Sequence, residues 1–276
     1  MRGTVPAIRL STANDRSVSK DGDYVLYWMI ANRRLTYNFA LQRAVDWCLE
    51  LGKPLVVLEA LRGGYKWASV RLHQFIVEGM AANHAASKGR QFTYYPYIEQ
   101  KIDDGKGLLS TLAQDACVVV SDEFPCFMLP RMASAAAAQV PVCMELVDSN
   151  GIFPMRFSDR TFSRAFDFRR YLQRHLVSSG FPEFPSADPL IRLSGIGLPE
   201  IDEKVLSRWP MNDPAEQLAR GFADLPIDQS VGPAAIRGGS ETAASVLDRF
   251  FEERLPLYGD ERNHPDSEAA SGFSPY

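Results

Sequence analysis

Short apolar runs alternate with longer amphipathic segments through the first 150 residues of the chain. The apolar runs lie at 24–30, 54–60, 92–95, 117–121 and 141–147. Short, largely continuous runs of this kind are typical of strands that are covered on both faces of a sheet. Between them, apolar residues recur at spacings of three and four, which predicts helices at 35–51, 67–87, 107–114 and 126–138. Strands that alternate with helices in this way indicate an α/β fold with a parallel sheet.

The connections between these strands favour one topology. Right-handed crossovers predict a doubly wound, Rossmann-like sheet of five parallel strands in the order 3-2-1-4-5. In such a sheet, ligands bind beyond the carboxyl ends of the strands, where the strand order reverses. That rule points to the loops 31–34, 122–125 and 148–151, which follow the first, fourth and fifth strands.

The two ends of the chain have a different pattern. Residues 1–23 are mostly polar, and we expect a flexible segment before the α/β domain at 24–177. Eight prolines interrupt 178–237, which predicts an interdomain linker with short helices at about 202–208 and 213–222. Helical periodicity resumes at 238–276, with Ser240 as the expected N-cap and Pro256 as the expected end of the first helix.

Composition and charge limit the classes of protein to which the chain can belong. The net charge is −4, from 30 basic and 34 acidic residues, whereas dedicated nucleic-acid-binding domains are usually basic. The four cysteines form no CxxC pair and lie mostly beside apolar runs, as buried thiols in a reducing compartment do. There is no signal peptide and no apolar run long enough to span a bilayer. We therefore expect a cytoplasmic monomer without a membrane partner.

Common catalytic signatures are missing from the sequence. No GxGxxG, P-loop or GxSxG motif is present, and no Cys or His spacing predicts a metal site. Asp122 and Glu123 could act as an acid–base pair, although such residues more often cap the next helix. The segment 160–174 carries five arginines with interleaved aromatic residues. Packing of an amphipathic face on the sheet is the favoured interpretation, and contact with a phosphate backbone is the alternative.

Several segments together resemble class II DNA photolyases, in the photolyase/cryptochrome family. Four of them lie in the α/β domain: DYVLYWMI (23–30), LGKPLVVL (51–58), VVVSD (118–122) and VDSNGIFP (147–154). The C-terminal part carries Tyr258, then RNHP (262–265), then SGFSPY (271–276), similar to the family segment that wraps the diphosphate of the flavin. Phe273 replaces the usual leucine, and Ala270 stands where many members have threonine, which removes one hydroxyl donor.

The resemblance implies light-driven, FAD-dependent repair of cyclobutane pyrimidine dimers in damaged DNA. It implies an antenna chromophore, a deazaflavin or a folate, at the carboxyl ends of the strands. The residues expected to bind the FAD diphosphate are Tyr258, Ser271, Gly272, Phe273 and Ser274. Those expected to line the antenna pocket are Met29, Ala31, Asn32, Asp122 and Asn150.

The family comparison also implies that residues 238–276 are the start of a helical FAD-binding domain that continues beyond them. The DNA contacts and the flavin pocket would lie in that further domain, so we expect no catalytic residue in this chain and no repair activity from it alone. Two alternatives stay open: a cryptochrome-like blue-light receptor with the same architecture, and a stand-alone α/β module that binds a nucleotide-like ligand.

Overall fold

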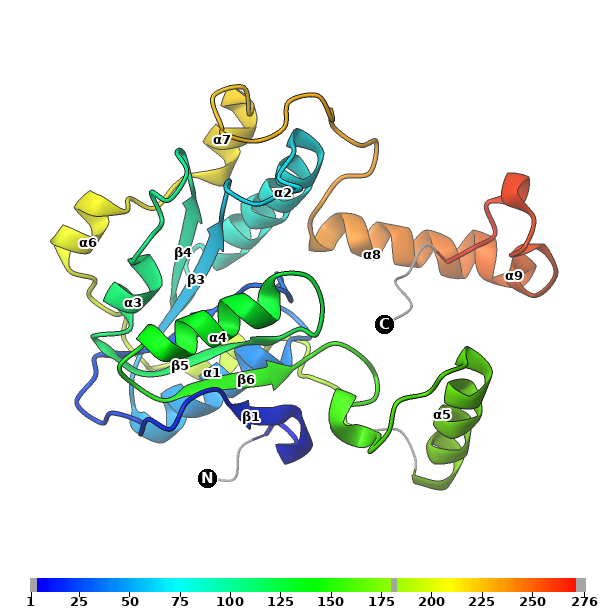
Figure 1. The fold of residues 1–276 in the computed structure, drawn as a ribbon, viewed down its shortest axis with the longest axis horizontal. Helices are drawn as coiled ribbons and strands as arrows, with labels where there is room; N and C mark the ends of the chain where they lie inside the picture. The colour runs from blue at the N-terminus through cyan, green and yellow to red at the C-terminus, as the bar shows by residue number, and fades with distance from the viewer. Residues whose placement is uncertain (1–3, 180–182, 272–276) are drawn as a thin grey trace. The chain divides into compact units, whose positions relative to one another are not determined.

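The computed structural model describes residues 4–179 and 183–271, and a mostly parallel six-stranded sheet organises them (Figure 1). The strands are β1 (Leu10–Thr12), β2 (Tyr24–Trp28), β3 (Leu55–Leu61), β4 (Thr93–Ile98), β5 (Ala116–Glu123) and β6 (Met144–Asp148). Their order is β1-β6-β5-β2-β3-β4. β2 pairs in parallel with β3 and β5, and β5 pairs in parallel with β6.

The predicted topology is confirmed for five strands, but the predicted number is wrong by one. β2 to β6 follow the order 3-2-1-4-5 in reverse, and the sixth strand, β1, joins the edge next to β6. β1 is antiparallel to β6, with Leu10 opposite Val147. It lies inside the segment that we expected to be flexible. Periodicity could not reveal it because β1 is short and none of its three residues is fully buried.

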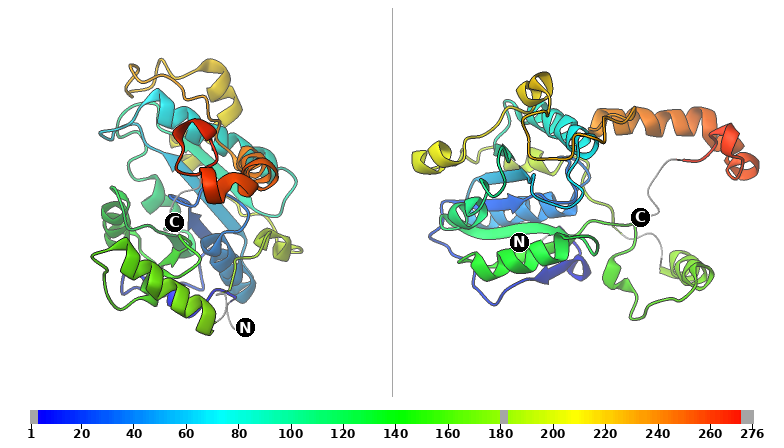
Figure 2. Two further views of the ribbon diagram at one scale, coloured as in Figure 1. Left: turned by 90° about the vertical axis from the view of Figure 1, so that its right-hand side faces the viewer. Right: turned by 45° about the horizontal axis from the view of Figure 1, so that its top comes forward.

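Helices connect the strands and cover the sheet. They are α1 (Phe39–Leu51), α2 (Val70–Ser87), α3 (Leu108–Leu112) and α4 (Leu129–Gln139), followed by α5 (Ala165–Ser179). α1 and α4 lie on opposite faces of the sheet (Figures 1 and 2), as the doubly wound topology requires. α1 ends at Gly52, whose φ of 66° is in the left-handed region that glycine adopts readily.

Among the described residues, the chain divides into two compact units. One comprises 4–58, 90–93 and 107–205, and the other comprises 59–89, 94–106 and 206–271. The domain boundaries expected from the sequence stay a prediction.

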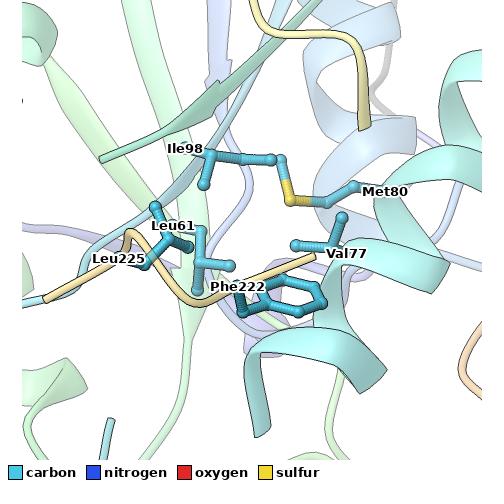
Figure 3. Packing of buried hydrophobic residues seen from close by; sticks show 6 residues of the cluster. All are labelled: Leu61, Val77, Met80, Ile98, Phe222 and Leu225. Atoms are coloured by element: carbon cyan, nitrogen blue, oxygen red, sulfur yellow. The ribbon is translucent and has the colours of Figure 1, made fainter. Parts of the chain in front are cut away.

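The second unit has an apolar core of its own. Leu61 and Ile98 from β3 and β4 pack with Val77 and Met80 from α2, as Figure 3 shows. Phe222 and Leu225 complete the cluster, and both come from the segment predicted to be a linker. This part of the linker is therefore packed into a core.

The linker also covers the outer edge of the sheet, between α6 (Glu203–Arg208) and α7 (Pro214–Arg220). The Tyr95 hydroxyl of β4 donates to the carbonyl oxygen of Trp209. Asn212 bonds to β4 twice: its N–H donates to the carbonyl of Pro96 at 2.9 Å, and its Oδ1 accepts from the Ile98 N–H at 2.6 Å. An uncovered edge strand would invite pairing with other chains, and these bonds satisfy it instead.

The C-terminal helices differ from the prediction at both of the residues that we expected to bound them. Gly239 is the N-cap of α8 (Ser240–Arg249), so Ser240 is its first residue. A π-helical turn (Phe250–Arg254) then leads into α9 (Leu255–Glu261). Pro256 lies in the first turn of α9, where a helix needs no N–H donor, so the proline begins a helix rather than ending one.

We predict that Asn212→Ala lowers the free energy of unfolding by about 1–2 kcal/mol, because the buried Ile98 N–H loses its acceptor. Asn212→Asp keeps an oxygen at this position and should retain most of the stability. Urea denaturation of the three proteins measures the difference. Equal losses in both variants would contradict a role for the acceptor.

We also predict that the free energy of unfolding decreases at alkaline pH because of Tyr95. Burial, and to a lesser extent the nearby Tyr97, raises the pKa of the Tyr95 phenol to about 12. Because the pKa in the unfolded chain is about 10, this stabilisation is complete below pH 10 and is lost as the pH rises toward 12. Tyr95→Phe should cost about 1 kcal/mol near pH 8. In urea titrations at about pH 10.5, the difference in the free energy of unfolding between this variant and the wild type should shrink by roughly 0.8 kcal/mol. A difference that stays constant with pH would exclude ionisation of Tyr95 as the cause.

Candidate functional site

The carboxyl end of β5 places a buried carboxylate where the strand order reverses. Asp122 follows the residue that pairs with Trp28, the last residue of β2. Its Oδ2 accepts three backbone N–H groups, from Ile30 at 2.9 Å, Ala31 at 2.7 Å and Asn32 at 3.0 Å. Its Oδ1 accepts the Tyr27 hydroxyl at 2.8 Å. Asp122 therefore fixes the loop after β2 through its two oxygens.

Tyr27 and Asn38 complete this network. Burial raises the pKa of Tyr27 well above its ordinary value, and the neighbouring Asp122 charge raises it further, so the phenol stays a donor. Asn38 is the N-cap of α1, where its Oδ1 accepts from the N–H groups of Ala40 and Leu41. Its Nδ2 donates to the Tyr27 hydroxyl at 3.0 Å and to loop carbonyls. The start of α1 and the loop after β2 are thus joined to β5.

The loop after β6 is held in a similar way. Asp148 Oδ1 accepts from the Asn150 N–H and side chain at 3.0 and 2.9 Å. The Asn150 amide also donates to the carbonyl of Glu123 at 2.7 Å, which links the loops after β5 and β6. Arg9 comes from the N-terminal segment, and its guanidinium donates to the carbonyls of Asp148, Gly151 and Ile152. Arg9 is 1% exposed and lies over the Phe39 ring, 4.5 Å from its centre.

All five residues predicted to line an antenna pocket lie at this end of the sheet, but they differ in exposure. Met29, Asn32 and Asp122 are buried, and the Asp122 oxygens are occupied by the loop. Ala31 and Asn150 are half-buried. Asp122 and Met29 thus fit a supporting role, because a ligand could reach neither side chain without displacing the loop.

Two exposed aromatic residues at the same end escaped the sequence analysis. Tyr37 precedes α1 and is 58% exposed, and Phe127 precedes α4 and is 78% exposed. Both have a left-handed backbone, with φ values of 48° and 58°. That conformation costs a bulky residue about 1–2 kcal/mol, and such strain is found most often at functional positions. Tyr37 lies two residues before α1 and Phe127 two residues before α4, and these helices follow β2 and β5 in the chain.

The residues predicted to bind the flavin are described only in part. Tyr258 lies on α9, is 38% exposed and meets the Phe250 ring edge to face at 5.9 Å. Ser271 is half-buried. Gly272, Phe273 and Ser274 lie outside the described residues.

The part of the chain that the structure describes contains neither a candidate metal site nor a candidate membrane-spanning helix. No group of three His, Cys, Asp or Glu side chains is placed to hold a metal ion. Likewise, no helix within 4–179 and 183–271 is long and apolar enough to cross a membrane.

Comparisons with known proteins agree with the resemblance seen in the sequence. No family model matches the chain. Over 275 residues it is 26% identical to a protein of Methanothermobacter thermautotrophicus named deoxyribodipyrimidine photo-lyase, covering 99% of the chain and 57% of that protein. It is 25% identical to a protein of the same name from Arabidopsis thaliana, covering 91% of the chain and 50% of that protein. A third, from Potorous tridactylus, is 24% identical over 261 residues and is covered to 44% of its length.

The chain is similar to deoxyribodipyrimidine photolyases over at least 91% of its length, which supports the photolyase/cryptochrome resemblance. It spans about half the length of these relatives. Its fold is similar to that of a bacterial class III photolyase from Agrobacterium tumefaciens, with a TM-score of 0.58 and 18% identity over 92% of the chain and 50% of that structure. Membership of class II, to which the sequence motifs point, stays a prediction within the photolyase/cryptochrome family.

We predict that Asp122→Ala lowers the free energy of unfolding by about 3 kcal/mol or more, because three N–H groups of the loop lose a shared acceptor. Amide hydrogen exchange at residues 30–32 should accelerate as well. Asp21→Ala, at an exposed position, is the matched control and should change stability by less than about 0.5 kcal/mol. A loss at Asp122 no larger than that of the control would refute the assignment.

Proposed function

We propose that the chain is part of a deoxyribodipyrimidine photolyase and that the residues present here mainly bind its antenna chromophore. The observation that carries the proposal is similarity across at least 91% of the chain to proteins of that name. Such an enzyme repairs cyclobutane pyrimidine dimers in damaged DNA with light, and FAD supplies the electron when it is bound. The names of the relatives give no support to a cryptochrome-like receptor or to a stand-alone nucleotide-binding module.

The antenna chromophore, a deazaflavin or a folate, would bind at the carboxyl ends of β2, β5 and β6. Ala31 and Asn150 are half-buried there and would contact it. Met29, Asn32 and Asp122 would shape the pocket from below, through the loop that Asp122 fixes. Tyr37 and Phe127 would stack on the planar rings of the chromophore, which would explain why two exposed aromatic residues adopt a strained backbone.

The flavin would be held by Tyr258, Ser271, Gly272, Phe273 and Ser274, by the family match. Tyr258 fits this role in one respect, since more than a third of its surface is exposed. The edge contact with Phe250 and the Arg262 guanidinium, 5.5 Å from the ring centre, would fix the orientation of the Tyr258 ring. We expect damaged DNA to bind mainly through a helical domain beyond the segment described here, in a cytoplasmic monomer.

Titration of the purified chain with a deazaflavin, a reduced folate and ATP, followed by fluorescence or calorimetry, tests the antenna proposal. One of the two chromophores should bind in preference to ATP. Phe127→Ala should weaken binding about fivefold, since one stacked ring contributes about 1 kcal/mol. Phe251→Ala, a matched change at a residue that is 55% exposed, should leave binding unchanged. Preference for ATP, or equal effects of the two variants, would overturn the proposal.

A separate measurement tests the expectation that these residues do not suffice for repair. The purified chain should show no stoichiometric flavin absorbance and no light-dependent loss of pyrimidine dimers. Stoichiometric FAD together with repair activity would show that the catalytic machinery is complete within the chain.

A further inference from the structure

Two glycines connect the predicted linker to the C-terminal helices. Gly238 and Gly239 stand directly before α8. Two adjacent glycines without contacts would form a flexible connection, because glycine has the widest choice of backbone conformations. In the structure both residues lie against α2 instead. We call the segment 228–239 the strap, because its backbone follows α2 from the start of that helix.

The first part of the strap is hydrogen-bonded to the start of α2. The Asp228 N–H donates to the carbonyl of Ala68 at 2.8 Å, and the Asp228 carbonyl accepts from the Val70 N–H at 3.1 Å. The carbonyl of Val231 then accepts from the Arg71 N–H at 3.2 Å. The first N–H groups of a helix have no partner within the helix, and these two carbonyls satisfy two of them. The strap therefore caps α2.

Farther along, the two glycines lie against the backbone of α2. A Cβ atom on Gly238 would overlap the carbonyl oxygen of Phe75, so a residue with a side chain fits there only if the strap moves. A Cβ atom on Gly239 would lie 3.3 Å from the Cβ of Ala82, and the φ of Gly239 is 105°, where glycine is favoured. On the helix, a Cβ atom on Gly79 would lie 3.8 Å from the nitrogen of Gly239. Both glycines of the strap are thus needed for close approach to α2 rather than for flexibility.

A carboxylate of α2 holds the same contact. Glu78 Oε2 accepts from the Gly238 N–H at 2.6 Å, and its Oε1 accepts from the side-chain amide of Gln74 at 3.1 Å. Gln74 lies one helical turn earlier, so its amide orients the carboxylate of Glu78. A hydrogen bond to an ionised acceptor is stronger than one between neutral groups. Glu78 therefore fixes Gly238 on α2 in addition to the close steric fit.

The same two glycines begin α8. The Gly239 carbonyl accepts from the Ala243 N–H at 3.1 Å, and the Gly238 carbonyl accepts from the Thr242 hydroxyl at 3.3 Å. Gly239 is followed directly by Ser240, the first residue of α8, so no residue separates the contact with α2 from the helix. A helix whose first turn is built on a fixed backbone cannot rotate about a linker. The direction of α8 therefore follows from the contact itself.

We propose that Gly238 and Gly239 form a rigid joint that fixes the direction of α8 on α2, and that Glu78 keeps this joint closed. Opening the joint would release the helices after it from α2 and leave the apolar core of the unit packed, because the residues of that core lie outside the strap. Tyr258 lies beyond the joint, so under the proposed function the joint would also position a flavin contact. The joint itself rests on the contacts above and not on that function.

Limited trypsin digestion of the whole chain, followed by mass spectrometry, tests the role of Glu78. The bond between Arg237 and Gly238 fits a protease only after the strap has left α2, so the rate of its cleavage follows the open population. Glu78→Ala should raise this rate at least about tenfold, because the joint loses a charge-assisted hydrogen bond. Glu78→Gln keeps an oxygen acceptor and should stay within about threefold of the wild type. The matched control, Glu50→Ala at an exposed position of α1, should cleave like the wild type. Equal rates in Glu78→Ala and in the control would overturn the inference.

Amide hydrogen exchange separates opening of the joint from unfolding of the unit. Gly238→Ala should accelerate exchange at residues 243–247 at least about tenfold, because a short helix without a packed start is marginal in water. Exchange at Val77 and Ile98, in the core, should stay within about twofold of the wild type. The matched control is Gly232→Ala, in the same strap, where a Cβ atom would have no neighbour within 4 Å, and it should change neither rate. Equal effects of the two glycine variants would overturn the inference, as would acceleration in the core as large as that in α8.

Discussion

One buried carboxylate determines the geometry of the carboxyl end of this sheet. Asp122 stands at the end of β5, beside β2, where the strand order reverses. The backbone N–H groups of the loop after β2 have no neighbouring strand to pair with here. A carboxylate can accept several hydrogen bonds at once, and here it accepts three from consecutive residues as well as one from Tyr27. Through Tyr27 and Asn38 the same oxygens are linked to the start of α1. The loop, the helix and the two central strands thus form one hydrogen-bonded unit.

This arrangement restricts which groups can recognise a ligand. The acidic side chain at the switch point is consumed by the loop, and the Asn150 amide is used between the loops after β5 and β6. In the proposed antenna site, ligand contact would be left to the backbone, to half-buried Ala31 and Asn150, and to the exposed rings of Tyr37 and Phe127. Such a rim suits a planar, largely apolar ring system better than a free phosphate, which agrees with the absence of GxGxxG and P-loop motifs from the sequence. The rigid loop held by Asp122 and the aromatic rings of Tyr37 and Phe127 would act together, because stacking selects a ligand by its shape only when the loop cannot move.

The sequence predicted what depends on local patterning and missed what depends on contacts between distant residues. The five buried strands and their order followed from apolar runs and from the handedness of crossovers. β1 was missed because its three residues form a strand only by pairing with β6, more than 130 residues away. The adjacent Arg9 bonds to the carbonyl of Asp148, which is equally distant in the sequence. Periodicity located Asp122 at a strand end but could not show which amides surround it. For the same reason, the sequence could not show the hydrogen bonds of Asn212 or the packing of Phe222.

Net charge does not describe the distribution of charge around α5. A value of −4 sums over the whole chain, but a phosphate responds to the charges within about one Debye length, roughly 10 Å at moderate salt. In the same unit, ion pairs such as Arg43–Glu145 and Arg192–Asp46 use arginines to hold elements together, and their fields cancel locally. An acidic protein can therefore present a basic face, and the distribution of its ion pairs, rather than their total, indicates where an anion would bind.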